Sequence, residues 1–504
     1  MIYEGKDIKG TVREEADVCI IGSGAGGATV ALELAQRGMK VVVLEEGGAY
    51  FTEDFDGKIK RATKLFYRNQ GMDATLGVPA VLVPTGKCLG GTTVINMGTC
   101  FRAPDNILEL WEEAGLEGWG VEGLAPYYDR VEERMSIQPV KPEVMGKNGE
   151  TIAMGAEKLG LHPQPIRRNV NDKCRGCGNC AYGCTEAAKE AMVINAVPQA
   201  SEAGAVFYCD TRAQHVLNDG RRATGVHATV RDRETGSFRY SVDISAKVVV
   251  LSCGALHTPS LLLKNGIANK SGKVGKHLKL HLAARTIGIF DEVIDAHRGV
   301  CQNLYIDDYL DQGIMLEATF TGPASQVPGT IGIGQDLWDI VKQYRHIASL
   351  GIMISEKTEG RVRADDNGDP VMTFHIGQED ARTLQKAMLV ADRVLFAAGA
   401  KKVMNGNLAM PVINTVTELE DFSAQKTRAS DYLLMAFHPQ GTCRMGTDPK
   451  KSVVNGEGRS HDIENLYIAD ASVFPTSLGV NPQETIWAVS SKISEGIAAD
   501  HFSK

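Results

Sequence analysis

The sequence predicts an α/β fold: a Rossmann-like dinucleotide-binding domain, discontinuous in the chain, joined to an α+β domain built on an antiparallel sheet. Near the amino terminus, a short strand, a glycine-rich loop, a helix and a second strand follow one another. Apolar runs at residues 247–251 and 466–469 have the character of further strands of the same sheet. A β-rich stretch lies between them. With 504 residues, the chain is too long for one ordinary core, which agrees with two domains.

The first unit carries a dinucleotide fingerprint. Gly22, Gly24 and Gly27 follow the strand 17–21 in the pattern G-x-G-x-x-G and open a helix that ends before Gly38. These glycines allow a tight turn, a close backbone approach to a pyrophosphate, and close packing of helix on strand. The helix start directs positive potential at the phosphates. Glu45 ends the strand 40–44, where its carboxylate can accept hydrogen bonds from a ribose diol.

The second domain is expected from strands at residues 349–356, 360–364 and 370–376, with a turn signal at 365–368. Residues 379–398 have helical periodicity and stop at Gly399. The predicted division gives the cofactor domain residues 1–105, 205–290 and 450–504. The substrate domain then takes residues 106–204 and 291–449, including a cysteine-rich loop at 170–190.

Composition and charge exclude several classes. The chain is 43% hydrophobic and 23% charged, as in a globular enzyme. A net charge of −8 favours neither nucleic acid nor an anionic membrane as a partner. No signal peptide and no apolar run of about 18 residues is recognisable, so we expect a cytoplasmic protein without a spanning helix.

Four of the eleven cysteines form one run. Cys174, Cys177, Cys180 and Cys184 have the spacing x2, x2, x3, which is an iron–sulfur ligand pattern. Three interpretations stay open: a [4Fe–4S] or [3Fe–4S] cluster, a structural zinc ion, or thiols that bind no metal. Single cysteines such as Cys301 are expected to be buried structural thiols.

Three later stretches resemble the glucose–methanol–choline (GMC) oxidoreductases. Residues 86–96 resemble the first signature of that family, and residues 254–267 resemble the second. Residues 438–446, followed by 468–472 and 479–483, resemble its carboxy-terminal catalytic block. Similar cysteine runs occur in some relatives, including long-chain alcohol oxidases, and bacterial FAD-dependent glucose dehydrogenases carry a cluster. The resemblance implies FAD as the cofactor and an alcohol as the substrate.

The resemblance also implies roles for individual residues at the cofactor. Ile95 stands where some relatives carry a flavin-linked histidine, so FAD is expected to bind non-covalently. The start of a carboxy-terminal helix would face the flavin and stabilise its reduced anion. The implied contacts are Gly90, Gly91, Thr92, Thr93, Asn96, Ala213 at the adenine, Asp470 and Ala471 at the ribityl–phosphate region, and Pro482 and Gln483 at the helix start.

The catalytic pair is expected to be His438 and Asn481. An imidazole with a pKa near 6.5 suits removal of the hydroxyl proton while the carbon gives hydride to flavin N5. Asn481 would hydrogen-bond the substrate oxygen. The isolated histidines His257, His281 and His375 are interpreted as structural.

The predicted function is an FAD-dependent alcohol dehydrogenase that passes electrons singly through an iron–sulfur cluster to an electron-acceptor protein or quinone. The alternatives are an oxygen-using alcohol or sterol-type oxidase without a cluster, and a lyase that uses the flavin as a scaffold. The substrate wall is expected around residues 302–333 and the strands after Ser349. The apolar side chains of the first stretch suggest a bulky or hydrophobic alcohol, but core packing explains the same pattern at least as well; they are Ile314, Met315, Leu316, Phe320 and Ile331.

Overall fold

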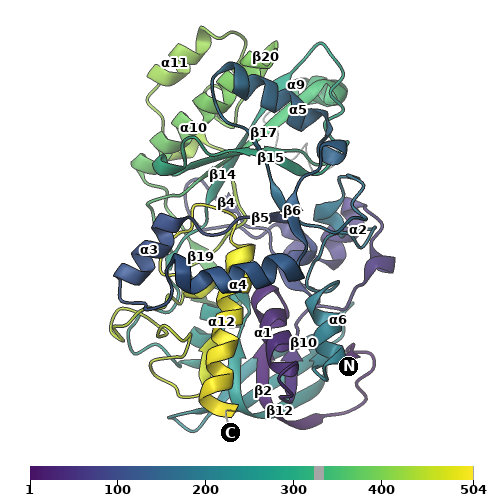
Figure 1. The fold of residues 1–504 in the computed structure, drawn as a ribbon, viewed down its shortest axis with the longest axis vertical. Coiled ribbons are helices and arrows are strands. Elements are labelled where there is room, and N and C mark those ends of the chain that lie inside the picture. Colours follow the sequence, from purple (N-terminus) through teal and green to yellow (C-terminus); the bar gives the residue numbers. More distant parts are fainter. Residues whose placement is uncertain (323–333, 503–504) are drawn as a thin grey trace.

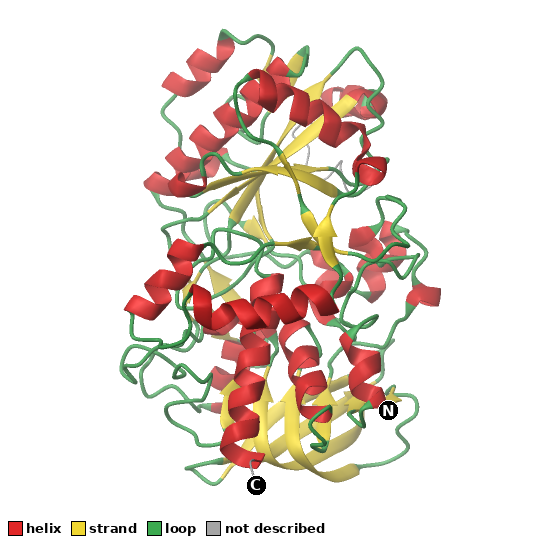
Figure 2. Ribbon diagram, viewed as in Figure 1, coloured by secondary structure: helices red, strands yellow, loops and turns green. Residues whose placement is uncertain are grey.

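The computed structural model describes residues 1–322 and 334–502 and places two large sheets one above the other along the long axis (Figure 1). Coloured by secondary structure, the lower sheet and the upper sheet each carry helices on their faces (Figure 2). Both chain ends lie beside the lower sheet (Figure 1). The predicted combination of a Rossmann-like domain and a second α+β domain is therefore confirmed.

The lower sheet has eight strands in the order β1-β9-β3-β2-β12-β11-β10, with β23 beside β12. Pairing is parallel from β1 to β12 and at β23, and antiparallel at β11 and β10. The carboxyl halves of β2 and β3 are buried and rich in β-branched residues, as a parallel sheet covered on both faces requires. The bounds are β1 Ile2–Tyr3, β2 Val12–Ile21, β3 Val41–Leu44, β9 Val206–Tyr208, β10 Thr211–Asn218, β11 Ala223–Arg231, β12 Phe238–Leu251 and β23 Leu466–Ile468.

Helix α1 (Ala25–Ala35) packs between α12 (Gln483–Phe502) and α6 (Ala196–Glu202) on one face of this sheet (Figure 1). The third fingerprint glycine explains how closely α1 approaches. A Cβ on Gly27 would lie 1.9 Å from the carbonyl oxygen of Gly22, so no side chain fits there. Helix α4 (Val121–Arg134) packs across α12.

The upper sheet has nine strands in the order β21-β20-β14-β17-β16-β15-β7, with β22 beside β14 and β4 beside β22. All pairs are antiparallel except β22 with β4. Helices α10 (Gln378–Ala397) and α5 (Pro142–Lys158) pack on it. The bounds are β4 Val81–Leu82, β7 Gln164–Pro165, β14 Leu282–Ile289, β15 Gln302–Ile306, β16 Ile314–Thr319, β17 Ile347–Ile354, β20 Lys402–Met404, β21 Val412–Ile413 and β22 Leu434–Ala436.

Two findings refine the expected layout. Strands β4 and β14 belong to the upper sheet, although the sequence assigned their segments to the cofactor domain. The hairpin of β18 (Gly360–Ala364) and β19 (Pro370–Thr373) forms at the predicted turn but joins β13 (Lys276–Leu278) in a separate three-stranded sheet. A second small sheet orders β5 (Thr99–Cys100), β8 (Arg167–Asn169) and β6 (Ile137–Pro139).

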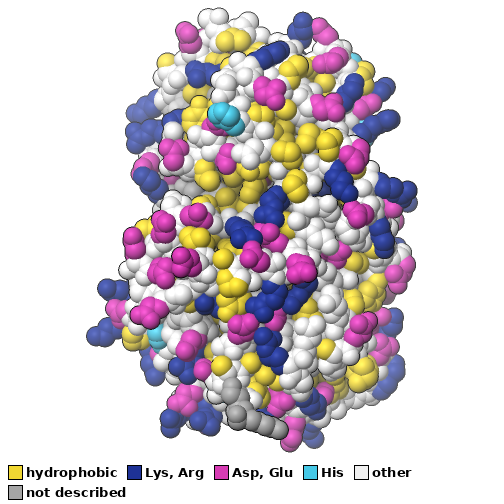
Figure 3. Space-filling view, viewed as in Figure 1, with side chains coloured by type: hydrophobic (Ala, Val, Ile, Leu, Met, Phe, Trp, Pro, Cys, Tyr) yellow, Lys and Arg dark blue, Asp and Glu magenta, His cyan; other side chains and the backbone are white. Residues whose placement is uncertain are grey.

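The remaining longer helices are α2 (Ile59–Leu65), α3 (Asp105–Glu113), α7 (Gly254–Asn265), α9 (Gln335–Lys342) and α11 (Glu418–Ala424). Within residues 1–322 and 334–502, no helix combines the length and the apolar character that a bilayer span needs. The surface in Figure 3 mixes charges of both signs, with apolar side chains gathered in a band where the two halves meet.

Candidate active site

A cavity of about 650 Å³ is lined by both halves of the molecule. Its lining brings together segments that are far apart in the chain, including the glycine loop, the end of β22 and the start of α12. Most of the predicted site residues line it. They are Gly22, Gly24, Glu45, Gly91, Thr92, Thr93, Asn96, Ala213, His438, Asp470, Ala471, Asn481, Pro482 and Gln483.

The glycine loop presents backbone to the cavity. Gly22 has a φ of +97°, which favours glycine, and a Cβ on Gly24 would meet no atom within 4 Å. No side chain caps α1, so its first N–H groups are free of a side-chain acceptor. The open space before a helix start suits an anionic group such as a pyrophosphate.

Glu45 is buried at the end of β3, and burial raises the pKa of its carboxyl. It accepts hydrogen bonds from the Ser23 hydroxyl at 2.6 Å, the Ser23 N–H at 3.0 Å and the Gly47 N–H at 2.7 Å. The Ser23 hydroxyl also accepts a bond from the Gly90 N–H at 3.0 Å, which joins the two glycine-rich loops. Gly27 and Gly90 do not line the cavity themselves, but each contacts a residue that does, Gly22 and Ser23 respectively.

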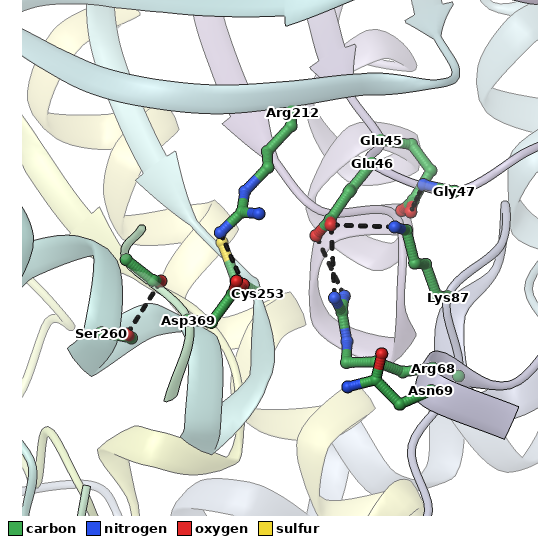
Figure 4. Close-up of polar contacts among 12 residues, drawn as sticks. Glu45, Glu46, Gly47, Arg68, Asn69, Lys87, Arg212, Cys253, Ser260 and Asp369 are labelled. Carbon is green, nitrogen blue, oxygen red and sulfur yellow. Dashed lines mark hydrogen bonds and ion pairs between the residues drawn. The ribbon is translucent and has the colours of Figure 1, made fainter. Parts of the chain in front are cut away.

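The same end of the cavity carries charged pairs that the sequence did not predict (Figure 4). Glu46 accepts both guanidinium branches of Arg68, at 3.2 and 3.0 Å, and Lys87 Nζ lies 3.2 Å from it. Burial alone would raise the pKa of Glu46, but the charges of Arg68 and Lys87 hold it well below the usual range. On the other side, Arg212 donates to Asp369 at 2.7 Å.

The start of α12 is fixed to the loop after Gly91. Asn96 Nδ2 donates to Gln483 Oε1 at 2.7 Å, and Gln483 Nε2 donates to the carbonyl of Thr99 at 2.7 Å. Asp470 is also braced by the protein, because it accepts from Thr258 Oγ1 at 2.6 Å and from the Gly254 N–H at 2.9 Å.

These features fit FAD. The glycine loop leaves room for a pyrophosphate, and Glu45 stands at the end of β3, where a ribose would lie. Ile95 lines the cavity and offers no atom for a covalent link. His257 Nε2 and Arg68 Nε are buried there without a hydrogen-bond partner in the protein, as expected of groups left for a polar ligand.

His438 and Asn481, the expected catalytic pair, both line the cavity and lie next to each other. Asn481 Nδ2 lies 3.4 Å from His438 Nε2, and Asn481 Oδ1 is buried without a partner. Burial lowers the pKa of His438 to about 4, so its imidazole is neutral at physiological pH. The pair comes from the loop after β22 and the residue two before α12.

The sequence missed the carboxyl group in the same wall. Glu317 on β16 lines the cavity, is 6% exposed, and accepts from Gln302 Nε2 at 2.8 Å. The Asn481 carboxamide lies beside it, and Oε1 of Glu317 has no hydrogen-bond partner in the protein. Burial raises the pKa of Glu317 to about 7. The one sequence signal for Glu317 is that a charged residue stands within an otherwise apolar strand segment.

The predicted apolar wall is partly corrected. Glu317 and Thr319 face the cavity, while Ile314, Leu316 and Phe320 point to the opposite face and pack into the core, because successive strand side chains point to opposite faces. Met315 shares the face of Glu317 but is buried and does not line the cavity. Ile331 lies outside the described residues.

His281, interpreted from the sequence as structural, lies next to His438. It is fully buried, and its Nδ1 lies 3.3 Å from Nδ1 of His438. His257 also lines the cavity, whereas His375 is exposed.

The cysteine run does not show the predicted metal site. All four cysteines line one small separate cavity, but among the described residues no three His, Cys, Asp or Glu side chains are placed to share a metal ion. Cys180 Sγ instead accepts from Arg168 Nη2 at 3.1 Å and lies close to the free thiol of Cys301. Cys184 Sγ accepts from the N–H groups of Ala188 and Lys189, each at 3.3 Å. The iron–sulfur prediction is thus unsupported by the arrangement of its ligands.

Comparison with known proteins agrees with a flavin-binding oxidoreductase. Residues 17–51 match a model for an FAD binding domain. Residues 42–283 and 356–490 match the two models of the GMC oxidoreductases. An uncharacterized GMC-type oxidoreductase of Mycobacterium tuberculosis is 36% identical over 96% of this chain and 76% of its own length. The chain belongs to the GMC oxidoreductase family, whose alcohol-oxidising members act on CH–OH groups.

Other relatives carry more specific names. A long-chain-alcohol oxidase of Arabidopsis thaliana is 28% identical over 96% of this chain and 68% of its own length. Among solved structures, a formate oxidase superposes with a TM-score of 0.74 at 16% identity, over 97% of this chain and 99% of the other. A pyridoxine 4-oxidase from Mesorbium loti gives 0.68 at 18% identity, over 95% and 99%. At these identities the structural likeness establishes the fold.

Proposed function

We propose that this protein oxidises an alcohol to a carbonyl compound with FAD as its non-covalent cofactor. The observation that carries the proposal is the meeting of His438, Asn481 and Glu317 in the cavity that also holds the dinucleotide loop. FAD, when bound, supplies the acceptor for the hydride that leaves the alcohol carbon, at its N5. Every other part of the reaction is left to side chains of the chain itself.

Those side chains can bind the alcohol and handle its proton. Asn481 and His438 offer hydrogen bonds to the hydroxyl oxygen, which fixes the carbon that loses hydride. Two groups could take up the hydroxyl proton: His438, as the sequence predicts, and Glu317, whose pKa of about 7 suits proton transfer near neutral pH. The aliphatic wall from Ile352, Met353 and Leu433 favours an alcohol with an apolar body.

Dioxygen is the acceptor we propose for the electrons. The support is that relatives across the whole chain are named as oxidases, among them the long-chain-alcohol oxidase and a paromamine 6'-oxidase of Streptomyces fradiae at 26% identity. The second candidate is a dehydrogenase with an external protein or quinone acceptor. It is favoured by one observation, the common cavity of Cys174, Cys177, Cys180 and Cys184 beside Lys189.

Two experiments separate the candidates. Primary alcohols of increasing chain length should reduce the bound FAD under anaerobic conditions, and admitted oxygen should reoxidise it with one hydrogen peroxide formed per alcohol consumed. A lyase would leave the flavin oxidised. If iron and acid-labile sulfide accompany the anaerobically purified protein and oxygen reacts slowly, the dehydrogenase replaces the oxidase.

A further inference from the structure

We propose that His281 is a positioning residue that fixes the tautomer of His438, with the proton of the neutral His438 ring on Nε2. This inference rests on the proposed function, since it assigns how His438 meets the substrate. His281 immediately precedes β14, its ring lies against the ring of His438, and it does not line the cavity.

The surroundings of His281 Nε2 show that this nitrogen accepts hydrogen bonds. The Gly479 N–H donates to it at 3.1 Å, and a backbone N–H cannot accept. Gln440 Nε2 donates to it at 2.9 Å. The orientation of that amide is set by its other end, because Gln440 Oε1 accepts from the Leu478 N–H at 3.3 Å. Ser477 Oγ lies 2.8 Å away and can donate as well.

An accepting Nε2 leaves one arrangement for the His281 ring. A protonated, cationic ring would place a second N–H against the Gly479 N–H, so the ring is neutral. Burial, which lowers the pKa of His281, favours the same form. The single ring proton then resides on Nδ1.

That proton faces His438. His281 Nδ1 lies 3.3 Å from His438 Nδ1, and the two rings are nearly perpendicular, at 77°. Because His281 donates, His438 Nδ1 accepts, and the proton of a neutral His438 is on Nε2, the nitrogen that faces Asn481. The buried Asn481 Oδ1, which has no partner, becomes an acceptor for this proton if the carboxamide turns over.

The backbone of His281 gives independent support. His281 has a φ of +53°, in a region that residues with a side chain rarely adopt. Such strain persists where the surrounding contacts determine the conformation, and here those contacts are the donors around Nε2 and the ring of His438.

The consequence is a changed role for His438. With an N–H on its Nε2 it enters the reaction as a hydrogen-bond donor that orients the alcohol oxygen and stabilises negative charge there. Of the two groups named above, this leaves the carboxylate of Glu317 to take up the hydroxyl proton.

The test is the tautomer itself, read by long-range ¹H–¹⁵N correlation on the FAD-loaded, histidine-labelled full chain. We expect His438 to show a protonated Nε2 and an unprotonated Nδ1. His281→Asp places only an acceptor where Nδ1–H stood and should move the His438 proton to Nδ1. His281→Asn can supply an N–H at that position and should keep it on Nε2.

His277→Ala is the matched control. His277 also has a positive φ, of +63°, but its ring bonds Glu359 at 2.6 Å rather than His438. A wild-type His438 with its proton on Nδ1, or an unchanged tautomer in His281→Asp, would overturn the proposal. If the Asp variant does not fold, the wild-type spectrum decides alone. Failure of the proposed function would be seen separately: no alcohol would reduce the bound FAD, whichever tautomer His438 adopts.

Discussion

The two ends of the cavity are built in different ways. At the cofactor end, the glycine loop Gly22–Gly26 presents backbone to the cavity, and Glu45 follows it within the same local strand–helix–strand unit, beside the second glycine-rich loop at Gly91. At the substrate end, the wall consists of side chains from separate elements: Glu317 on β16, His438 after β22 and Asn481 before α12. Cofactor binding at the first end depends on the space that the glycines leave. Catalysis at the second end depends on which side chain carries each proton.

The largest effect is expected at the substrate end, from His438→Ala. Loss of a donor aimed at the reacting oxygen should slow alcohol-driven FAD reduction by ~10²–10³. Bound FAD should stay stoichiometric, because the cofactor end is untouched. Rapid mixing under anaerobic conditions measures the rate, and His375→Ala, an exposed histidine, is the control. A wild-type rate would remove His438 from the chemistry.

Glu317→Gln should slow the same step by ~10² if its carboxylate takes the proton. The carboxylate fraction grows as pH rises through the pKa of about 7, so the wild-type rate should rise across that range and the Gln variant should lose the rise.

Asp392→Asn is the matched control for Glu317. Burial raises the pKa of Asp392 to about 7 as well, but it bonds Asn405 and Thr286 in the core of the upper half. If Glu317→Gln and Asp392→Asn change the pH profile in the same way, the profile reflects the stability of the protein rather than proton transfer. His438 would then be the base.

At the cofactor end, substitutions of two glycines should separate an effect on protein stability from an effect on FAD affinity. Gly27→Ala drives a methyl group to 1.9 Å from the Gly22 oxygen and should destabilise the protein by ~1–3 kcal/mol. Gly24→Ala finds open space, so the unfolding temperature of the apoprotein should not change while FAD binding weakens. Thermal unfolding and FAD titration measure the two effects. Equal loss of stability in both variants would show that Gly24 is a packing residue.

The smallest effect on catalysis is expected from the cysteine run. Cys180→Ala removes one acceptor of the buried Arg168 guanidinium, whose Nη2 still donates to the Met97 carbonyl at 2.6 Å, and should cost ~1 kcal/mol of stability. Anaerobic FAD reduction and oxygen uptake should keep their wild-type rates. Slow reoxidation in this variant alone would give the run a part in electron transfer.

The difference between the cofactor end and the substrate end also explains which site residues could be predicted from the sequence. The fingerprint from Gly22 to Glu45 is local, so spacing and strand–helix order identify it, and the GMC resemblance placed His438 and Asn481. Glu317 and His281 were missed because each acquires its role from neighbours that the fold brings from elsewhere in the chain, Asn481 and His438 respectively.

The cysteine run shows what spacing leaves undetermined. Its spacing matches cluster ligands, but spacing alone does not tell which groups will contact each thiol. Arg168, Lys189 and Cys301 take up those contacts, and none of them belongs to the motif. The apolar pattern of β16 left two interpretations open, a substrate wall and core packing, and the structure shows its apolar residues in the core while Glu317 faces the cavity.

The central claim is that an alcohol reacts where His438, Asn481 and Glu317 meet beside FAD. Anaerobic mixing of the FAD-loaded protein with a series of primary alcohols tests it most directly, with His438→Ala in parallel. The account predicts full FAD reduction by at least one alcohol of the series and a rate lower by ~10²–10³ in the variant. FAD that stays oxidised with every alcohol, or reduction at equal rates in both proteins, would contradict it.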